Sequence, residues 1–219
     1  MICLCIGKPS VGLCQELLPG VELAEIRLDG ADLSADEIRR IFTLHDNLIA
    51  TYRPSPGTDS AGKRKMALLT AIEAGAAYVD IEIEARDAYK KEIIQTARKR
   101  DCRVILSYHN YENTPSKKQL DTIIEQCFFE GADIAKIVCQ VHSEADCARI
   151  LSLYDYPGQL HQGKIAALGM GEKGKITRLA ASFLGAPFTY ASLSRGNETA
   201  PGQLDKDTLE RILGWISSR

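Results

Sequence analysis

The amino-acid sequence predicts a single α/β domain over residues 1–219, folded as a (β/α)8 barrel of the TIM type. Three observations lead to this fold class. Short apolar runs rich in β-branched residues recur eight times, helical patterns lie between them, and no Pro-, Gly- or Ser-rich linker divides the chain. An open doubly wound sheet is the alternative architecture, and the regular strand–helix alternation favours the barrel.

The predicted strands are short and apolar, as expected for strands that are covered on both faces. In chain order they are Ile2–Gly7, Leu23–Asp29, Asn47–Arg53, Tyr78–Glu84, Arg103–Asn110, Asp133–Cys139, Lys164–Met170 and Phe188–Leu193.

The clearest predicted helix runs from Ser116 to Glu130, with Ser116 as its cap and Gly131 as its stop. The final helix is predicted over 205–217, and the pattern at 11–18 is short and weak. Helical spacing places apolar residues on one face of each helix. The residues predicted on these faces are Leu120, Ile123, Ile124, Cys127 and Phe128 in the first, Met66, Leu69 and Ile72 in the helix after the third strand, and Leu209, Ile212, Leu213 and Ile216 in the last.

Composition narrows the function classes. The net charge of −2 gives no sign of a nucleic-acid partner or of an anionic membrane partner. No apolar run reaches the roughly 20 residues of a membrane span, and the first residues lack the basic region of a signal peptide. The seven cysteines form no CxxC pair, which predicts reduced, mostly buried thiols in a cytoplasmic protein.

Lys136 is the most informative residue. It lies in the apolar run 131–139, where burial disfavours an ammonium and would lower the pKa of the amine. A neutral lysine amine can attack a ketone to form a Schiff base. The preceding strand ends in His109, so the two side chains can meet in one carbonyl-chemistry site. The plain alternative is a lysine that extends to solvent at a strand end and a loop histidine.

In a (β/α)8 barrel, chemistry takes place at the carboxyl ends of the strands. Charged side chains are concentrated at these ends in this chain, which predicts a polar barrel mouth. They are Glu25, Arg27, Asp29, Arg53, Asp80, Glu82, Glu84, His109 and Lys136, followed by Arg178 and residues 199–203 after the last two strands.

Several segments occur in an informative order. They are Glu25-Ile-Arg27, Asp80-Ile-Glu-Ile83, Val104-Ile-Leu-Ser-Tyr-His-Asn110, Gly131-Ala-Asp-Ile-Ala-Lys136, Gly174-Lys-Ile-Thr-Arg-Leu-Ala180 and Ala200-Pro-Gly-Gln203. Together they resemble the type I 3-dehydroquinate dehydratases, the Schiff-base-forming enzymes of the shikimate pathway, over nearly the whole chain. The resemblance implies a carbon–oxygen lyase of aromatic amino-acid biosynthesis, without cofactor or metal, that is a cytoplasmic homodimer acting on a small molecule.

The resemblance also implies a reaction. Lys136 would form an iminium with the C3 ketone of 3-dehydroquinate. His109 would remove the C2 proton as general base and then protonate the departing C1 hydroxyl, a syn loss of water that gives 3-dehydroshikimate.

The remaining site residues follow from the same resemblance. Arg178 would bind the substrate carboxylate with the help of a helix N-terminus, and residues 194–204 could close over the ligand as a lid. The implied substrate-binding residues are Glu25, Arg27, Arg53, Arg178, Thr199 and Gln203, and the supporting residues are Glu82 and Met170.

The chain departs from the family pattern at Gly57, where many members carry a glutamate. The usual partner of the catalytic histidine is then missing or is supplied by Glu82. Thr199 stands where serine is common and keeps the hydroxyl.

Other functions stay open on the sequence. Residues 169–174 fit G-x-G-x-x-G, although a tight turn before an anion-binding helix explains them better than a dinucleotide site. Asp80, Glu82 and His109 could hold a metal, but Lys136 would repel it. A cysteine nucleophile beside His109 is a further possibility. The wider alternatives are another Schiff-base lyase, such as a sugar-phosphate aldolase, and an inactive metabolite-binding barrel.

Overall fold

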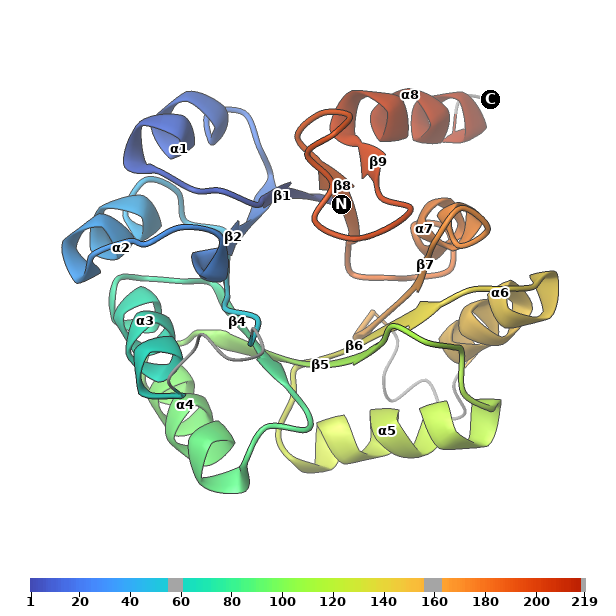
Figure 1. Cartoon of the computed structure of the whole chain (residues 1–219), viewed down its shortest axis with the longest axis horizontal. Helices are drawn as coiled ribbons and strands as arrows, with labels where there is room; N and C mark the ends of the chain where they lie inside the picture. The colour runs from blue at the N-terminus through green and yellow to red at the C-terminus, as the bar shows by residue number, and fades with distance from the viewer. Residues whose placement is uncertain (55–60, 156–162, 218–219) are drawn as a thin grey trace.

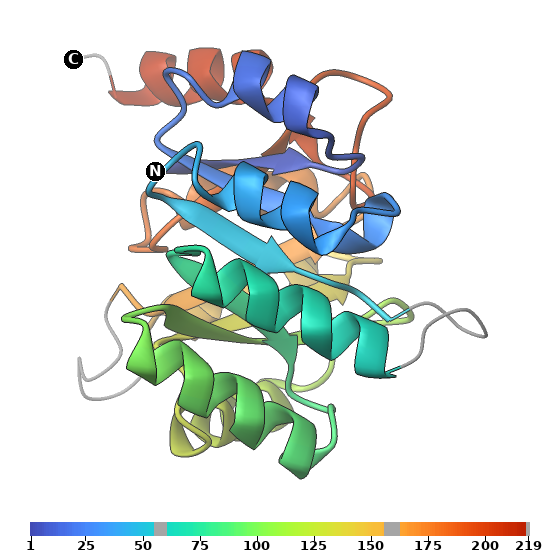
Figure 2. The same cartoon turned by 90° about the vertical axis from the view of Figure 1, so that its left-hand side faces the viewer.

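A computed structural model describes residues 1–54, 61–155 and 163–217. Nine strands form one parallel sheet in the order β7-β6-β5-β4-β3-β2-β1-β8-β9, and the sheet curls so that the helices lie outside it (Figure 1). Seen from the side, the strands occupy the centre and the helices cover them (Figure 2). The predicted TIM-barrel-like α/β fold is confirmed.

The eight predicted strands are all present. The observed strands are β1 Ile2–Ile6, β2 Leu23–Arg27, β3 Leu48–Thr51, β4 Tyr78–Glu82, β5 Arg103–Asn110, β6 Ile134–Gln140, β7 Ile165–Met170, β8 Thr189–Ser192 and a short additional strand, β9 Leu204–Asp205. The helices are α1 Val11–Leu17, α2 Ala35–Phe42, α3 Ala61–Glu73, α4 Asp87–Lys99, α5 Lys117–Phe129, α6 Glu144–Leu151, α7 Lys175–Ala181 and α8 Lys206–Ser217, with 3-10 turns at Leu28–Gly30 and Ser152–Tyr154.

Side-chain caps fix where several helices begin. Ser116 accepts a hydrogen bond from the backbone of Gln119, whose side chain accepts from the backbone of Ser116 in return. Ser34 makes the same reciprocal pair with Glu37 at α2. Each such cap satisfies backbone N–H groups that a helix start leaves without partners. The loops that lead into these helices are therefore held in place.

The apolar interior has two parts, one on each side of the sheet. The larger part lies between the strands and the helices, and it includes Leu120, Ile124 and Cys127 of α5. The smaller part fills the inside of the barrel, where Tyr78, Phe188 and Tyr190 pack edge to face. All seven cysteines are free and buried, as predicted.

Two residues predicted on buried helix faces, Met66 of α3 and Ile216 of α8, are wrong, and Ile216 is 57% exposed. Met66 is 60% exposed, whereas Leu68, Ala71 and Ile72 of α3 are buried. The buried stripe has spacing i, i+3, i+4 from Leu68, so Met66 falls outside it. The predicted positions Leu69 and Ile72 do lie at or beside the stripe.

A loop joins the two ends of the sheet. Within the described residues β7 and β8 are not paired, and the chain after β8 returns alongside β8 as β9. The Gly171 N–H donates to the Pro201 carbonyl at 3.1 Å. A Cβ on Gly202 would lie 2.2 Å from the Gly171 oxygen, so these two turns touch only because glycine occupies that position. The 169–174 turn therefore contacts and supports the 194–204 loop.

Candidate active site

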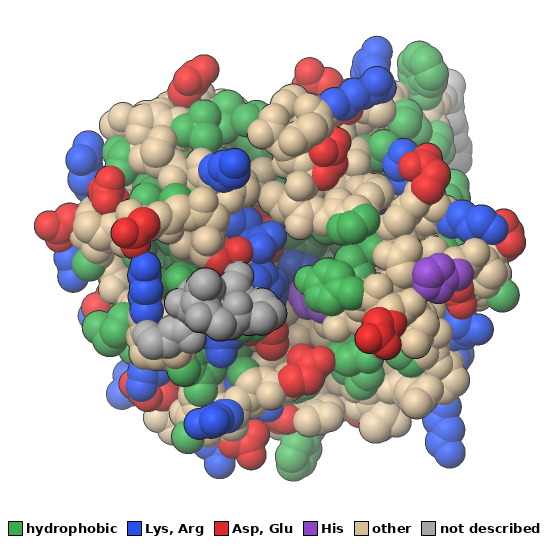
Figure 3. Space-filling view, viewed as in Figure 1, with side chains coloured by type: hydrophobic (Ala, Val, Ile, Leu, Met, Phe, Trp, Pro, Cys, Tyr) green, Lys and Arg blue, Asp and Glu red, His purple; other side chains and the backbone are tan. Residues whose placement is uncertain are grey.

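A cavity of about 250 Å³ opens at the carboxyl ends of the strands. The space-filling view shows Lys and Arg side chains and a histidine gathered around a hollow at the centre of this face (Figure 3). The lining residues are Cys5, Glu25, Arg27, Asp29, Arg53, Pro54, His109, Tyr111, Lys136, Val138, Leu168, Met170, Arg178, Tyr190, Thr199, Ala200 and Gln203.

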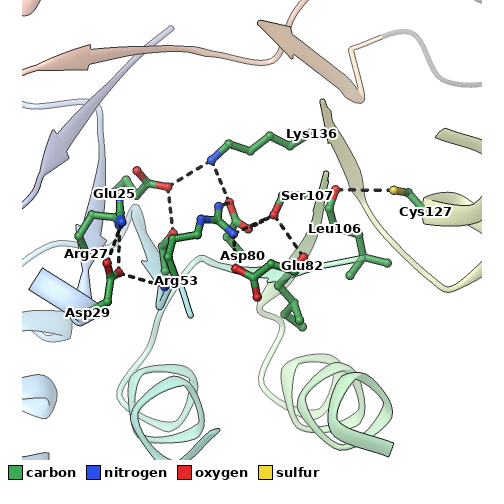
Figure 4. Close-up of polar contacts among 12 residues, drawn as sticks. Glu25, Arg27, Asp29, Arg53, Asp80, Glu82, Leu106, Ser107, Cys127 and Lys136 are labelled. Atoms are coloured by element: carbon green, nitrogen blue, oxygen red, sulfur yellow. Dashed lines mark hydrogen bonds and ion pairs between the residues drawn. The ribbon is translucent and has the colours of Figure 1, made fainter. Parts of the chain in front are cut away.

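Lys136 of β6 extends across the barrel interior to two carboxylates (Figure 4). Its Nζ lies 2.9 Å from Asp80 Oδ2 and 3.3 Å from Glu25 Oε1. Burial alone would lower the pKa of Lys136, but the Asp80 and Glu25 carboxylates outweigh burial and raise this pKa. The sequence-based expectation of a neutral amine is therefore wrong for the free site, because it considered burial without these partners.

Asp80 connects Lys136 to Arg53. The Arg53 guanidinium donates to Asp80 Oδ2 at 2.6 Å, to Glu82 Oε1 at 2.7 Å and to Ser107 Oγ at 2.9 Å. Ser107 in turn donates to Asp80 Oδ1 at 2.6 Å. Burial opposes the ionised form of Asp80, yet Arg53 and Lys136 hold the pKa of this carboxyl far below its usual range. Asp80 is thus a fixed negative charge beneath the amine.

His109 lies on the same inward face of β5 as Ser107 and lines the cavity. Burial, together with the positive charges of Arg53 and Lys136, lowers the pKa of His109 well below its ordinary value. The imidazole is therefore neutral near pH 7 and able to accept a proton. Among the described residues its ring makes no hydrogen bond, and Tyr111 stacks on it at a centroid distance of 6.1 Å. Gly57 lies outside the described residues.

Arg178 of α7 is buried and has no counter-ion among the described residues. Its side chain is 2% exposed, and its Nε and Nη2 atoms have no hydrogen-bond partner in the described part of the chain. Burial lowers the pKa of Arg178 to about 10, so the guanidinium still carries its charge at neutral pH. A buried, unpaired cation that lines a cavity is a ready partner for an anionic ligand.

A second cationic group, Arg27 of β2, lines the same cavity. Arg27 donates to Asp29 through Nε at 3.0 Å and through Nη2 at 2.7 Å. Glu25, two residues earlier, accepts from Thr51 Oγ1 at 2.9 Å as well as from Lys136. These contacts hold both β2 side chains in fixed positions toward the cavity.

The loop after β8 lines part of the cavity through Thr199, Ala200 and Gln203. The Thr199 backbone N–H and hydroxyl both donate to Gln203 Oε1, at 2.8 and 3.1 Å. Gln203 Nε2 donates to the Cys5 sulfur at 3.1 Å, which ties the loop to β1. Met170, at the end of β7, lines the cavity below this loop.

Nine of the ten residues that the sequence singled out line one cavity. The exception is Glu82, which accepts from Arg53 and from Arg64 Nη1 at 3.3 Å and sits beside the cavity. Four further residues contact Lys136, Arg27 or Arg53 directly: Asp80, Asp29, Ser107 and Tyr190. The sequence placed Asp80 and Asp29 at the barrel mouth without a role in the reaction, and it did not identify Ser107 or Tyr190.

The open alternatives can be compared with this geometry. The oxygens of Asp80 accept from Arg53, Ser107 and Lys136, so this carboxylate is already saturated by protein donors. Among the described residues no group of three or more metal-ligating side chains is found. Burial raises the pKa of the Cys5 thiol to about 12, which suppresses the thiolate that a cysteine nucleophile needs.

The chain is similar to known proteins over nearly its whole length. A model of the family "Type I 3-dehydroquinase" matches residues 3–219. The chain is 34% identical to the 3-dehydroquinate dehydratase of Methanocaldococcus jannaschii over 97% of each chain, and 35% identical to that of Methanothermobacter thermautotrophicus over 90% of this chain and 86% of the relative.

Solved structures share the fold. The type I 3-dehydroquinate dehydratase of Clostridium difficile superposes with a TM-score of 0.85 at 22% identity, covering 98% of this chain and 91% of that one. The enzyme of Aquifex aeolicus gives 0.81 at 23% identity, with both chains fully covered. At this identity the solved structures show the fold, whereas the family model and the sequence relatives show the family. The chain belongs to the type I 3-dehydroquinase family.

Proposed function

We propose that this protein removes water from 3-dehydroquinate through a Schiff base on Lys136. The observation that carries the proposal is that the buried Lys136 amine shares a cavity with Arg178, whose Nε and Nη2 atoms have no partner among the described residues. One group can react with a ketone and the other can bind a carboxylate. 3-Dehydroquinate carries both, and the curated relatives are named as its dehydratases.

Imine formation needs a neutral amine, so a proton must leave Lys136 before attack. The acceptors within the cavity are the neutral imidazole of His109 and the Glu25 carboxylate, 3.3 Å from Nζ. The amine then adds to the C3 carbonyl, and loss of water from the adduct leaves an iminium. Asp80 and Glu25 lie close enough to stabilise this new positive charge where it forms.

His109 performs the elimination. The iminium acidifies the C2 proton because the electrons of the broken C–H bond pass into an enamine. The neutral His109 accepts this proton and returns it to the C1 hydroxyl, which leaves as water. Hydrolysis of the remaining imine releases 3-dehydroshikimate and restores Lys136. One base on one side of the ring accounts for a syn elimination.

Substrate orientation comes from the cationic wall. The carboxylate would pair with Arg178, and the ring hydroxyls would contact Arg27, Gln203 and Glu25 from the rim. Thr199 and Gln203 would then exclude water over the imine. Among these groups only Arg178 lacks a protein partner for its charge within the described chain, which fits it to the charged end of the ligand.

The test is turnover of 3-dehydroquinate, followed by the ultraviolet absorbance of the conjugated product. Lys136→Ala should abolish turnover, whereas Lys117→Ala, which removes a partly exposed lysine of α5 paired with Asp121, should leave it unchanged. Full activity of Lys136→Ala would refute the proposal. An imine without product would indicate an aldolase acting on another ketone, and neither imine nor product would indicate a binding-only barrel.

The predicted homodimer and cytoplasmic location remain proposals. Light scattering on the eluting protein should give a mass twice the 24.1 kDa of one chain. No helix in the described residues is long and apolar enough to span a membrane.

A further inference from the structure

Tyr190 of β8 lies against the reactive lysine. The Lys136 Nζ sits over the Tyr190 ring, 4.1 Å from its centroid. The ring is 3% exposed and packs edge to face on Phe188 at 5.4 Å, so its orientation is fixed from behind. A desolvated cation over an aromatic face is attracted by the negative face of the ring.

The ring, not the hydroxyl, is the part that contacts the amine. Tyr190 Oη is buried and has no hydrogen-bond partner among the described residues. A buried hydroxyl without a partner costs stability. Hydrogen bonding by its oxygen to the described residues therefore does not account for a tyrosine at position 190. The aromatic face is the feature that this position supplies to the cavity.

Several charged or titratable groups face the amine from the strands around it. They are Asp80 of β4, Glu25 of β2, Arg53 of β3, His109 of β5, and Cys3 and Cys5 of β1, with Tyr190 itself on β8. The two carboxylates draw Nζ toward β2 and β4. The ring closes the remaining side, so the three groups together define one position for a cation.

We propose that Tyr190 is a positioning residue whose ring face holds the Lys136 ammonium, and the iminium formed from it, between Asp80 and Glu25. This inference rests on the proposed function only in taking Lys136 as the reactive amine. The iminium keeps its positive charge at the same nitrogen, so the ring favours it over the neutral adduct that precedes it. The enamine carries no such charge. The ring therefore helps to keep the imine nitrogen protonated, and the protonated imine is the group that accepts the electrons when the C2 proton is removed.

The proposal predicts a change in the protonation of Lys136 itself, measured without substrate. Competitive labelling with acetic anhydride across a pH series modifies only neutral amines, and peptide mass spectrometry then gives the pKa of Lys136. In Tyr190→Leu and Tyr190→Met, loss of the ring should lower this pKa by about one unit, the size expected for a desolvated cation–π contact. Tyr190→Phe keeps the face and should leave the pKa unchanged.

A matched control separates positioning from packing. Phe188→Leu removes a buried ring that packs on Tyr190 and keeps the Tyr190 ring beneath Lys136 Nζ, so it should lower the melting temperature and leave the Lys136 pKa in place. Tyr190→Phe should melt no lower than the wild type, because it removes only an unpaired hydroxyl. The pKa of Lys117, obtained from the same digests, serves as an internal reference for the labelling reaction and should be the same in all variants.

Two results would overturn the inference. One is an unchanged Lys136 pKa in Tyr190→Leu and Tyr190→Met. The other is an equal shift in Phe188→Leu, which would mean that general loosening of the barrel interior moves the pKa. Because the labelling uses no substrate, either result leaves the dehydration proposal intact, and failure of dehydration leaves this measurement valid.

Discussion

Replacing Arg178 with methionine should make the protein more stable and a poorer enzyme. Methionine keeps the long unbranched shape and removes a charge that is 2% exposed and has no partner for Nε or Nη2 in the described chain. Burial lowers the pKa of Arg178 to about 10. At about 1.4 kcal/mol per pKa unit, the buried charge costs the folded state roughly 3 kcal/mol at neutral pH.

The sign of this cost follows from proton binding. When the pKa of a base is lower in the folded state, the folded protein loses that proton at a lower pH than the unfolded protein does. Below pH 10 both states carry the charge and the cost is present in full, and it disappears only as the pH rises above the folded-state value. Arg178→Met should therefore raise the free energy of unfolding at pH 7 by about 1–3 kcal/mol.

Activity should change in the opposite direction. Loss of a buried partner for a carboxylate costs about 2–4 kcal/mol of binding, which lowers kcat/KM for 3-dehydroquinate by about 30- to 10³-fold. The loss should appear mainly in KM, because the carboxylate is bound in the ground state as well as in the transition state.

Urea unfolding and steady-state kinetics on the same preparations measure both quantities. Arg53→Met is the matched control, because Arg53 has Asp80 and Glu82 as partners and its loss would leave two carboxylates uncompensated. That variant should be destabilised by about 3–5 kcal/mol. A destabilised Arg178→Met with unchanged kcat/KM would show that Arg178 is a structural residue and refute the reasoning.

Three further predictions follow from the same geometry. The NMR titration of the His109 ring should give a pKa below the ordinary 6.5, so the ring stays neutral to lower pH, and a normal or raised value would contradict its assignment as a neutral base. Asp80→Asn leaves Arg53 and Lys136 without their shared partner and should lower the free energy of unfolding in urea by about 3–5 kcal/mol, with no change as the opposing outcome. Gly202→Ala places a Cβ 2.2 Å from a backbone oxygen at a positive φ of 77°, so KM should rise about tenfold through a displaced loop, and wild-type kinetics would show that the loop does not cover the substrate.

The fold could be predicted because its signals are local. Alternating strand and helix patterns and the caps at Ser116 and Gly131 depend on neighbouring residues, and the structure follows them to within a few positions. The exceptions are Met66 and Ile216. Met66 reflects a shift in the buried face of α3, which depends on how that helix lies on the sheet. Ile216 is exposed near the end of α8, where Leu209 is the buried residue.

The site could be predicted in outline for a related reason. All parallel strands present their carboxyl ends at one edge, so polar residues at those ends must converge. Which of them touch is not a local property. Ser107 pairs in register with both Glu82 and Lys136, yet the amine contacts Asp80, two residues earlier on β4. Strands in a barrel are tilted and staggered, so residues in register do not lie at one height.

The charge state of Lys136 shows the same limit. Its burial was evident from the apolar run around it, and burial alone predicts a lowered pKa. The two carboxylates that reverse the sign come from β2 and β4, 111 and 56 residues away in sequence. The balance between burial and the two carboxylates, which sets the pKa of Lys136, is therefore determined only by the folded structure.

The most direct test of the central claim is borohydride reduction of the protein mixed with 3-dehydroquinate, followed by peptide mass mapping. A stable adduct should appear on the peptide that carries Lys136, be absent from Lys136→Ala, and persist in His109→Ala, where turnover falls by about 10²- to 10⁴-fold but the amine remains. An adduct on another lysine, or turnover of 3-dehydroquinate with no trapped adduct at all, would contradict Schiff-base chemistry at Lys136.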